Sequence, residues 1–282
     1  KRQTEGRFEI DPEENAFTSY EAAWKRAPRS LFDEPFSRTI DELRLHGWKS
    51  VPDRMRELPV IHRAILDEWK RGTEQDRGVA EQPAEVLWYS TPVRESLLIV
   101  RLSTLHIASC MAAGRTNEAW EWLRAQLRFS RHLGNPGGSI DRTSGMAIYS
   151  TAAESIAIWA AHDSVTAEQL KVARDELRSI YKMTAANSAV LKCGYIATQN
   201  VLHSAEDLKS YCRQDFGSPG LLTGVPRSLE GSYLFLLGEP EVTELLLRHW
   251  CANLLSQCDL PREERRPVSY THLRAHETAL YL

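Results

Sequence analysis

The sequence lacks the short motifs by which the common enzymatic chemistries are recognised. It contains no G-x-x-x-x-G-K-[ST] loop, no G-x-G-x-x-G, no G-x-S-x-G and no H-E-x-x-H. A nucleotide-dependent enzyme, a serine hydrolase or a zinc protease normally shows one of them, because each motif positions the groups that bind phosphate, act as nucleophile or hold a metal. We therefore predict no catalytic residue and no cofactor.

The chain also lacks an excess of charge of either sign. Its 35 Lys and Arg residues are balanced by 38 Asp and Glu residues, and the formal net charge is -3. The two signs are interspersed, whereas proteins that bind nucleic acid or anionic membranes usually gather basic residues in one patch. We expect no nucleic-acid partner.

Cysteine is scarce, and its positions fit neither a disulfide framework nor a zinc motif. The 5 cysteines include no C-x-x-C pair, and an odd number cannot pair completely within one chain. Cys251 and Cys258 would lie about 10 Å apart along one helix, at about 1.5 Å per residue, which is beyond disulfide reach. We interpret the cysteines as core thiols and predict no metal site.

Long uninterrupted apolar runs are absent as well. No stretch reaches the length of about 18 apolar residues that a membrane span needs, so we expect no membrane insertion within this chain. Hydrophobic residues nevertheless make up 42% of the sequence and charged residues 26%, close to the average of soluble globular proteins. This composition supports a sizeable buried core.

What the sequence does contain is apolar residues at the three- and four-residue spacing of amphipathic helices. We predict an all-α fold, an array of about seven to nine antiparallel helices. Helices are expected over residues 11–27, 37–46, 53–71, 92–113, 116–133, 140–161, 185–212 and 240–258, with one more after a capping box at 166–169. Asp11 and Thr116 are further expected N-caps, and Pro59 either kinks its helix or marks the true beginning.

The expected helix over 92–113 is apolar on nearly every face, which is typical of a helix surrounded by others. Gly114 ends it, and the next helix follows at once, so the two should form an antiparallel hairpin with a very short turn. We expect residues 1–267 to form a single helical domain, with 1–90 and 91–258 as possible halves.

The residues after Pro267 differ in character from the rest of the chain. The stretch Val268–Thr278 resembles translated sequencing-adapter sequence, which occurs at the broken ends of assembled reading frames. We interpret residues 268–282 as an artefactual tail and exclude them from functional reasoning. His272 and His276 lie in this tail, but a zincin motif needs a Glu beside the first His.

The segment Ile107–Leu127, with Gly114 at the turn and Glu118-Ala119 early in the second helix, resembles a tetratricopeptide-type helical hairpin. No second copy recurs at the tetratricopeptide period of about 34 residues. His106 and Ile107 stand where that pattern prefers Leu and Gly. The resemblance implies tetratricopeptide-like hairpins without a regular repeat, and a protein that binds other proteins.

A second resemblance concerns Glu14-Asn15-Ala16-Phe17 and the helix around Gly145. Both are similar to an uncharacterised group of bacterial helical proteins that carry an N-terminal membrane anchor. The likeness implies that an anchor preceded Lys1 and that the domain belongs to the cell envelope, with the cytoplasm as the alternative. It implies no activity.

Three polar residues interrupt apolar helix stretches and are candidates for a polar site in the core: Arg101, His106 and Glu154. Arg101 and Glu154 either face solvent, form a buried ion pair, or bind a ligand, because a buried charge is costly unless it is paired. His106 is most simply a surface or hydrogen-bonded core histidine.

Two classes of function remain open. We expect a helical protein-interaction or scaffold module whose partner is another protein, because binding requires no catalytic group that the motif search failed to find. The alternative is an enzyme or small-ligand-binding protein with an inter-helix site around Arg101, His106 and Glu154.

The interpretation of the tail leads to a first prediction. Deletion of Val268–Leu282 should change the free energy of unfolding by no more than about 0.5 kcal/mol, because an accidental sequence makes no specific core contacts. Chemical denaturation of the full and shortened chains measures this difference. A clearly less stable shortened chain would show that the tail is a structural element.

Overall fold

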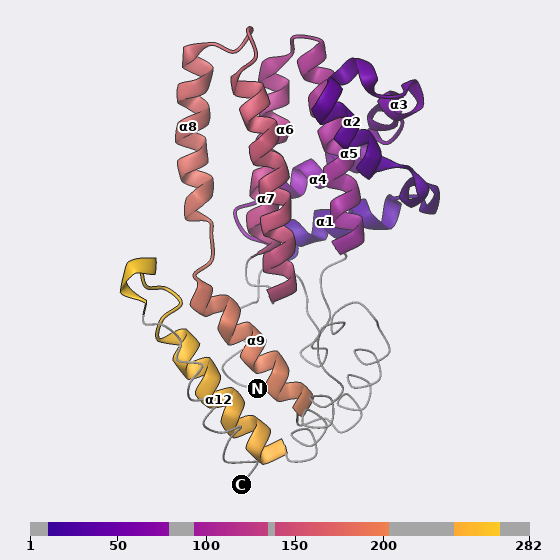
Figure 1. Ribbon diagram of the computed structural model, residues 1–282. Coiled ribbons are helices and arrows are strands. Elements are labelled where there is room, and N and C mark those ends of the chain that lie inside the picture. The colour runs from indigo at the N-terminus through magenta and orange to yellow at the C-terminus, as the bar shows by residue number, and fades with distance from the viewer. Residues whose placement is uncertain (1–10, 79–92, 135–138, 203–239, 266–282) are drawn as a thin grey trace.

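The computed structural model describes residues 11–78, 93–134, 139–202 and 240–265, and most of these residues are helical (Figure 1). More than half of the whole chain lies in the α-helices of these ranges. No β-strand occurs within them, and an isolated bridge joins Asn15 to Arg77. The predicted all-α fold is confirmed. The tail at 268–282 and the part of the 185–212 helix beyond Leu202 lie outside the described residues.

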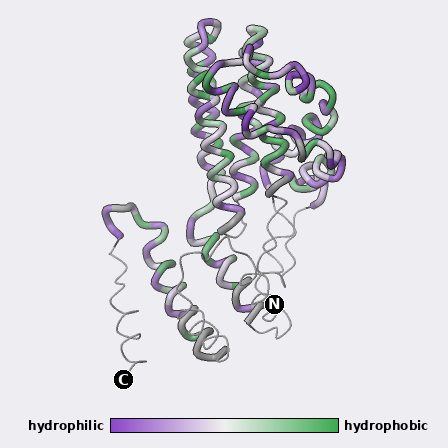
Figure 2. Tube along the Cα trace, turned by 45° about the vertical axis from the view of Figure 1, so that its right-hand side comes forward, coloured by the Kyte–Doolittle hydropathy of each residue, from purple (hydrophilic) through white to green (hydrophobic). Residues whose placement is uncertain are grey.

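Hydrophobic and hydrophilic residues alternate along the helices, as amphipathic packing requires (Figure 2). The helices are α1 (Ala16–Arg26), α2 (Phe36–His46), α3 (Asp53–Ile61), α4 (Arg63–Glu74), α5 (Val93–Ala112), α6 (Thr116–Leu133), α7 (Ser139–Ala160), α8 (Ala167–Lys182), α9 (Asn187–Leu202) and α12 (Pro240–Leu255). Short 3-10 helices are η1 (Arg29–Asp33), η2 (Trp48–Ser50) and η3 (Arg262–Glu264).

Helices α5 to α8 run roughly along one direction and form the body of the molecule (Figure 1). Within this body α6 contacts α5, α7 and α8. The paired helices α1 and α4 cross it, with α4 against α5 and α6, while α2 and α3 cover α5. Helices α9 and α12 lie side by side at one end, where α9 contacts α7.

Large aromatic rings fill the core between α1, α4 and α6. Trp69 and Trp122 are fully buried and stack with their ring centroids 6.4 Å apart. Phe129 meets Trp69 edge-on at 5.4 Å and Tyr20 at 4.7 Å. Burial of a ring with about 150–250 Å² of surface contributes several kcal/mol, so these contacts hold α1, α4 and α6 together. The core draws side chains from both sides of residue 90.

Two glycines allow helices to approach one another closely. A Cβ atom on Gly145 of α7 would lie 2.6 Å from the carbonyl oxygen of Ser130 on α6. A Cβ on Gly72 of α4 would lie 2.6 Å from the Tyr20 ring and 2.8 Å from the carbonyl oxygen of Ala16, both on α1. Any side chain at either position would force the paired helices apart.

Two of the expected N-caps, Asp11 and Thr116, are wrong. Helix α1 begins at Ala16, with Asn15 as its N-cap, because the Asn15 side chain accepts from the Phe17 amide at 3.1 Å and the Ala16 amide donates to the Arg77 carbonyl at 3.0 Å. Asp11 instead accepts from the Glu13 amide in a turn. Thr116 is the first residue of α6 and does not cap it; its hydroxyl accepts from Gln169 at 3.2 Å.

The remaining helix boundaries agree more closely with the sequence. Thr166 forms the expected capping box with Gln169 at the start of α8. The single helix expected over 53–71 is divided at His62 into α3 and α4. The division falls within one turn of Pro59, which has no amide hydrogen to donate and whose ring crowds the preceding turn.

Helix α5 contains a stretch, Glu95–Ala112, with the length and mean hydropathy of a membrane span. Neighbouring helices bury 61% of that stretch, and a core helix that packs on several sides has the same character.

The first turn of α9 is held by residues that come much later in the chain. The Ser188 amide donates to the Asp259 carboxylate at 3.2 Å, and the Asn187 side chain donates to the Cys258 carbonyl at 2.9 Å. The Asp259 carboxylate therefore accepts from an amide in the first turn of α9, a role that the side chain of the residue just before a helix usually has.

A buried hydrogen bond links α1 to the end of α6. The Tyr20 hydroxyl and Nδ1 of His132 lie 2.7 Å apart. Burial, and then the positive charge of Arg128, lower the pKa of His132 to about 3. In the unfolded chain this histidine would have a pKa of about 6.5 and would gain a proton as the pH falls through that value. In the folded protein the imidazole stays neutral until the pH approaches 3.

This difference predicts a loss of stability in mild acid. Between pH 6.5 and pH 3 the unfolded chain binds a proton at His132 and the folded chain does not. His132 therefore lowers the free energy of unfolding by up to about 1.4 kcal/mol for each pH unit that the pH falls. The contribution vanishes above pH 6.5. Urea unfolding at pH 7, 6, 5 and 4 should show a smaller pH slope for His132→Gln than for the parent, whereas the exposed His46→Gln should keep the parent slope. Equal slopes for parent and His132→Gln would contradict the assignment.

Candidate functional site

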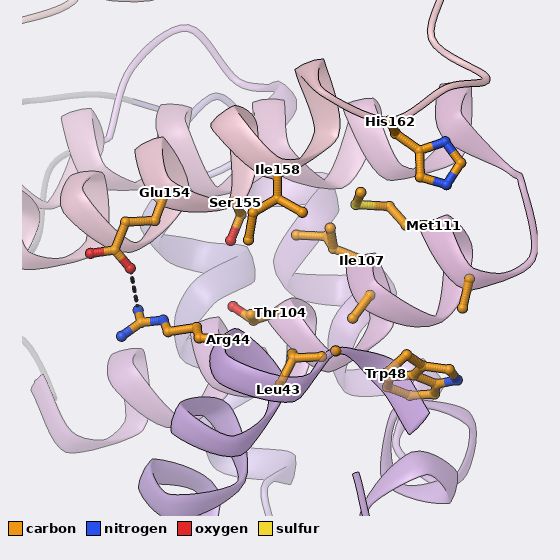
Figure 3. A pocket seen from close by; sticks show the side chains of 13 residues that line it. Leu43, Arg44, Trp48, Thr104, Ile107, Met111, Glu154, Ser155, Ile158 and His162 are labelled. Atoms are coloured by element: carbon orange, nitrogen blue, oxygen red, sulfur yellow. Dashed lines mark ion pairs between the residues drawn. The ribbon is translucent and has the colours of Figure 1, made fainter. Parts of the chain in front are cut away.

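An open pocket of about 240 Å³ lies where α2, α5 and α7 meet (Figure 3). Helix α5 contributes one stripe of residues at helical spacing, and the end of α2 and the end of α7 form the walls. The lining residues are Leu43, Arg44, Gly47, Trp48, Thr104, Ile107, Ala108, Met111, Ala112, Glu154, Ser155, Ile158 and His162. The pocket is therefore mainly apolar, with polar groups at its two ends.

The polar ends have different chemistry. At one end the Arg44 guanidinium pairs with the Glu154 carboxylate at 2.8 Å, and His162 lies at the opposite end (Figure 3). Between them Ile107, Met111 and Ile158 face the pocket. The Ile158 side chain is 53% exposed, so part of this apolar surface is open to solvent.

The wall contributed by α2 is fixed by a tight turn. Gly47 ends α2 with φ of +76°, a conformation that favours glycine, and its amide donates to the Leu43 carbonyl at 2.9 Å. The Ser50 hydroxyl then donates to the carbonyls of Glu42 and Gly47. These bonds hold η2 and hence the Trp48 ring at the pocket edge.

A polar cluster lies on a different stripe of α5, between α4 and α6. His106 and Cys110 are one helical turn apart on α5, and both are buried. Nε2 of His106 lies 3.2 Å from Oε1 of Glu118, 3.6 Å from Sγ of Cys110 and 3.1 Å from Nη1 of Arg63. Three groups of different chemistry, a carboxylate, a thiol and a guanidinium, thus converge on one imidazole nitrogen.

Burial dominates the titration of this cluster. It lowers the pKa of His106, an effect that the Arg63 charge increases, and it raises the pKa of Cys110 to about 11, with Glu118 acting in the same direction. Burial alone would raise the pKa of Glu118, but Arg115 and His106 outweigh it and lower that pKa. At neutral pH the cluster therefore holds a neutral imidazole, a thiol and a carboxylate.

The structure does not bring the three predicted polar residues together. His106 is buried in the cluster beside α6, whereas the Glu154 side chain is 56% exposed and lies at the pocket. Of the three alternatives for Arg101 and Glu154, the ion pair between them is not formed: Arg44 is the partner of Glu154, and half-buried Arg101 has no ion pair within the described ranges. Glu154 fits the solvent-facing interpretation.

Several residues of the pocket and of the polar cluster around His106 were not predicted from the sequence. The spacing of His106 and Cys110, four residues apart on a predicted helix, is visible in the sequence, but it matches none of the known metal or catalytic motifs. Arg63 and Glu118 join that pair only through the packing of α4 and α6 on α5. Leu43 lies in the expected helix over 37–46 and Trp48 follows it, but nothing in the sequence indicates that they face α5 and α7.

The Arg44–Glu154 pair leads to a prediction on stability. Its side chains are 39% and 56% exposed, so solvent screens the attraction and Glu154→Ala should lower the free energy of unfolding by less than about 1 kcal/mol. A double-mutant cycle with Arg44→Ala measures the coupling directly. A loss of about 3–5 kcal/mol would be the signature of a buried pair and would contradict this view of the surface.

Comparison with models of protein families, with curated proteins and with solved structures finds no match for this chain.

Proposed function

We propose that the chain is a helical protein-interaction module that holds an apolar anchor side chain of a partner protein in the pocket between α2, α5 and α7. The observation that carries the proposal is the lining of that pocket, an apolar floor with an ion pair at one end and a histidine at the other. Binding grooves for amphipathic segments combine the same features, because apolar anchors give affinity and polar rims give orientation.

The size of the pocket favours a side chain over a free metabolite. Sites for small molecules usually enclose about 300–1,000 Å³ and bury most of the ligand. This pocket has about 240 Å³ and is open to solvent along Ile158. A space of this kind fits one large side chain of a longer ligand whose remaining residues lie on the surface outside.

The side chains at the pocket suit adaptable binding. Met111 is flexible and polarizable, and methionine is common at surfaces that accept varied apolar partners. Arg44 and Glu154 are both partly exposed, so either can exchange its present partner for a charged group that flanks the anchor. We therefore expect the recognised segment to carry a large apolar residue with charged neighbours.

The alternative, an enzyme or small-ligand site around Arg101, His106 and Glu154, has less support. Such a site needs its polar groups within one enclosed volume. His106 and Arg101 do not line the pocket that Glu154 lines.

Selection from a displayed peptide library tests the proposal. Peptides enriched on the parent protein should share an apolar anchor, and they should bind Ile158→Glu at least tenfold more weakly, a loss of about 1.4 kcal/mol, because the variant places a charge at the apolar pocket. The matched control is Val172→Glu on α8, whose parent side chain is 49% exposed against 53% for Ile158.

The control should keep the parent affinity, and both variants should keep the parent melting temperature. Peptides that bind Ile158→Glu as tightly as the parent would place the binding surface elsewhere. Failure to enrich any anchor-bearing peptide would count against a protein-interaction role for this pocket.

A further inference from the structure

We propose that His106, Cys110 and Glu118 form a binding site for a divalent transition-metal ion of the zinc class. Their candidate ligand atoms, the His106 ring nitrogen, the Cys110 sulfur and a Glu118 carboxylate oxygen, all lie within 4.8 Å of one another. Nitrogen, sulfur and carboxylate oxygen are the donors that proteins offer to zinc. The site is separate from the apolar pocket, and neither proposal depends on the other.

Two of the three distances between the donors match the edges of a tetrahedron around zinc, and the third, between the Cys110 sulfur and the Glu118 oxygen, is no longer than 4.8 Å. With metal bonds of about 2.0–2.1 Å to nitrogen, 2.1 Å to oxygen and 2.3 Å to sulfur, tetrahedral coordination places nitrogen about 3.4 Å from oxygen and about 3.6 Å from sulfur. The observed separations are 3.2 Å from His106 Nε2 to Glu118 Oε1 and 3.6 Å from Nε2 to Cys110 Sγ. An ion can therefore enter with little movement of the backbone.

The turn between α5 and α6 sets this arrangement. His106 and Cys110 project from one face of α5, and Glu118 follows within the first turn of α6. Gly114 adopts φ of +72°, and the Arg115 amide donates to the Cys110 carbonyl at 2.8 Å, so the two helices are joined tightly next to the cluster. Arg115 also holds Oε2 of Glu118 at 3.0 Å, which leaves Oε1 directed at His106.

Arg63 marks the place of the ion. Its guanidinium, a positive group, lies 3.1 Å from His106 Nε2 and 3.9 Å from Glu118 Oε1, where those donors attract a cation. The Arg63 side chain is 46% exposed and also pairs with Asp67 at 2.8 Å. It can therefore swing outward, keep a carboxylate partner, and leave the fourth coordination position to water.

Binding changes the protonation of the cluster in a defined way. The Cys110 thiol loses its proton to solvent as the sulfur–metal bond forms, because a coordinating thiol is deprotonated. The imidazole is already neutral and the carboxylate already charged, so one proton is released for each ion bound. No oxidation or reduction takes place.

Titration of the reduced, untagged full chain with Co²⁺ tests the site. The parent should bind one ion with the near-ultraviolet absorption of a thiolate–Co²⁺ bond, and Zn²⁺ should displace it and raise the melting temperature. Cys110→Ser should lose this absorption, whereas Cys251→Ser, which removes another buried thiol, should keep it. A thiolate signal also excludes binding by His272 and His276 alone.

Arg63→Ala provides the second arm, because the residue is partly exposed and its loss removes a competing positive charge from the site. Its affinity for Co²⁺ should rise about tenfold, the scale of one unit charge at this distance in a partly solvated site. Absence of the thiolate absorption in the folded parent, or its persistence in Cys110→Ser, would overturn the proposal. So would unchanged or weaker binding by Arg63→Ala, a substitution at a partly exposed side chain that leaves all three ligands in place.

Discussion

The register of α5 against α6 determines where both candidate sites lie. It is fixed by Gln126, a buried residue of α6 whose amide donates to the Val100 carbonyl at 3.1 Å and to the hydroxyls of Ser103 and Thr104 at 2.7 and 3.0 Å. A buried amide left without partners is costly, so a shift along the helix axis by one turn is unfavourable. In the observed register Ile107 and Met111 face the pocket, while Glu118 meets His106.

Further polar links attach α4 and α8 to the same hairpin. Arg128 on α6 donates to the carbonyls of Gln75 and Thr73 at the end of α4, where the helix leaves its last carbonyls without amide partners. On the other side Glu176 of α8 accepts from Trp120 at 2.5 Å and from Arg124 at 2.7 Å. The surroundings of α6 are thus specified by directional bonds as well as by apolar burial.

The positions of most helices could be predicted from the sequence, but the contacts between helices could not. Apolar spacing predicted α5, α6 and α7 within a residue or so of their ends. Local cap chemistry predicted Asp11 as the first N-cap, whereas the structure uses Asn15, next to which Ala16 donates to Arg77 from a distant part of the chain. The partner of Glu154 was beyond reach for the same reason: Arg44 comes from a different helix far away in the sequence. Distances inside one helix, such as His106 to Cys110, needed no tertiary knowledge at all.

The unusual capping of α9 has a consequence for how the chain is made. Asp259 is separated from Ser188 by 71 positions, so a ribosome must synthesise that whole interval before the first turn of α9 acquires its carboxylate. Helices α1 to α8 share a hydrophobic core in which Ala173 is the last buried member among the described residues, with Leu177 packed against it. Because domains fold progressively as they emerge from the ribosome, the amino-terminal body should assemble first and α9 should wait for α12. A nascent chain stalled before Asp259 would therefore carry a finished body and an uncapped ninth helix.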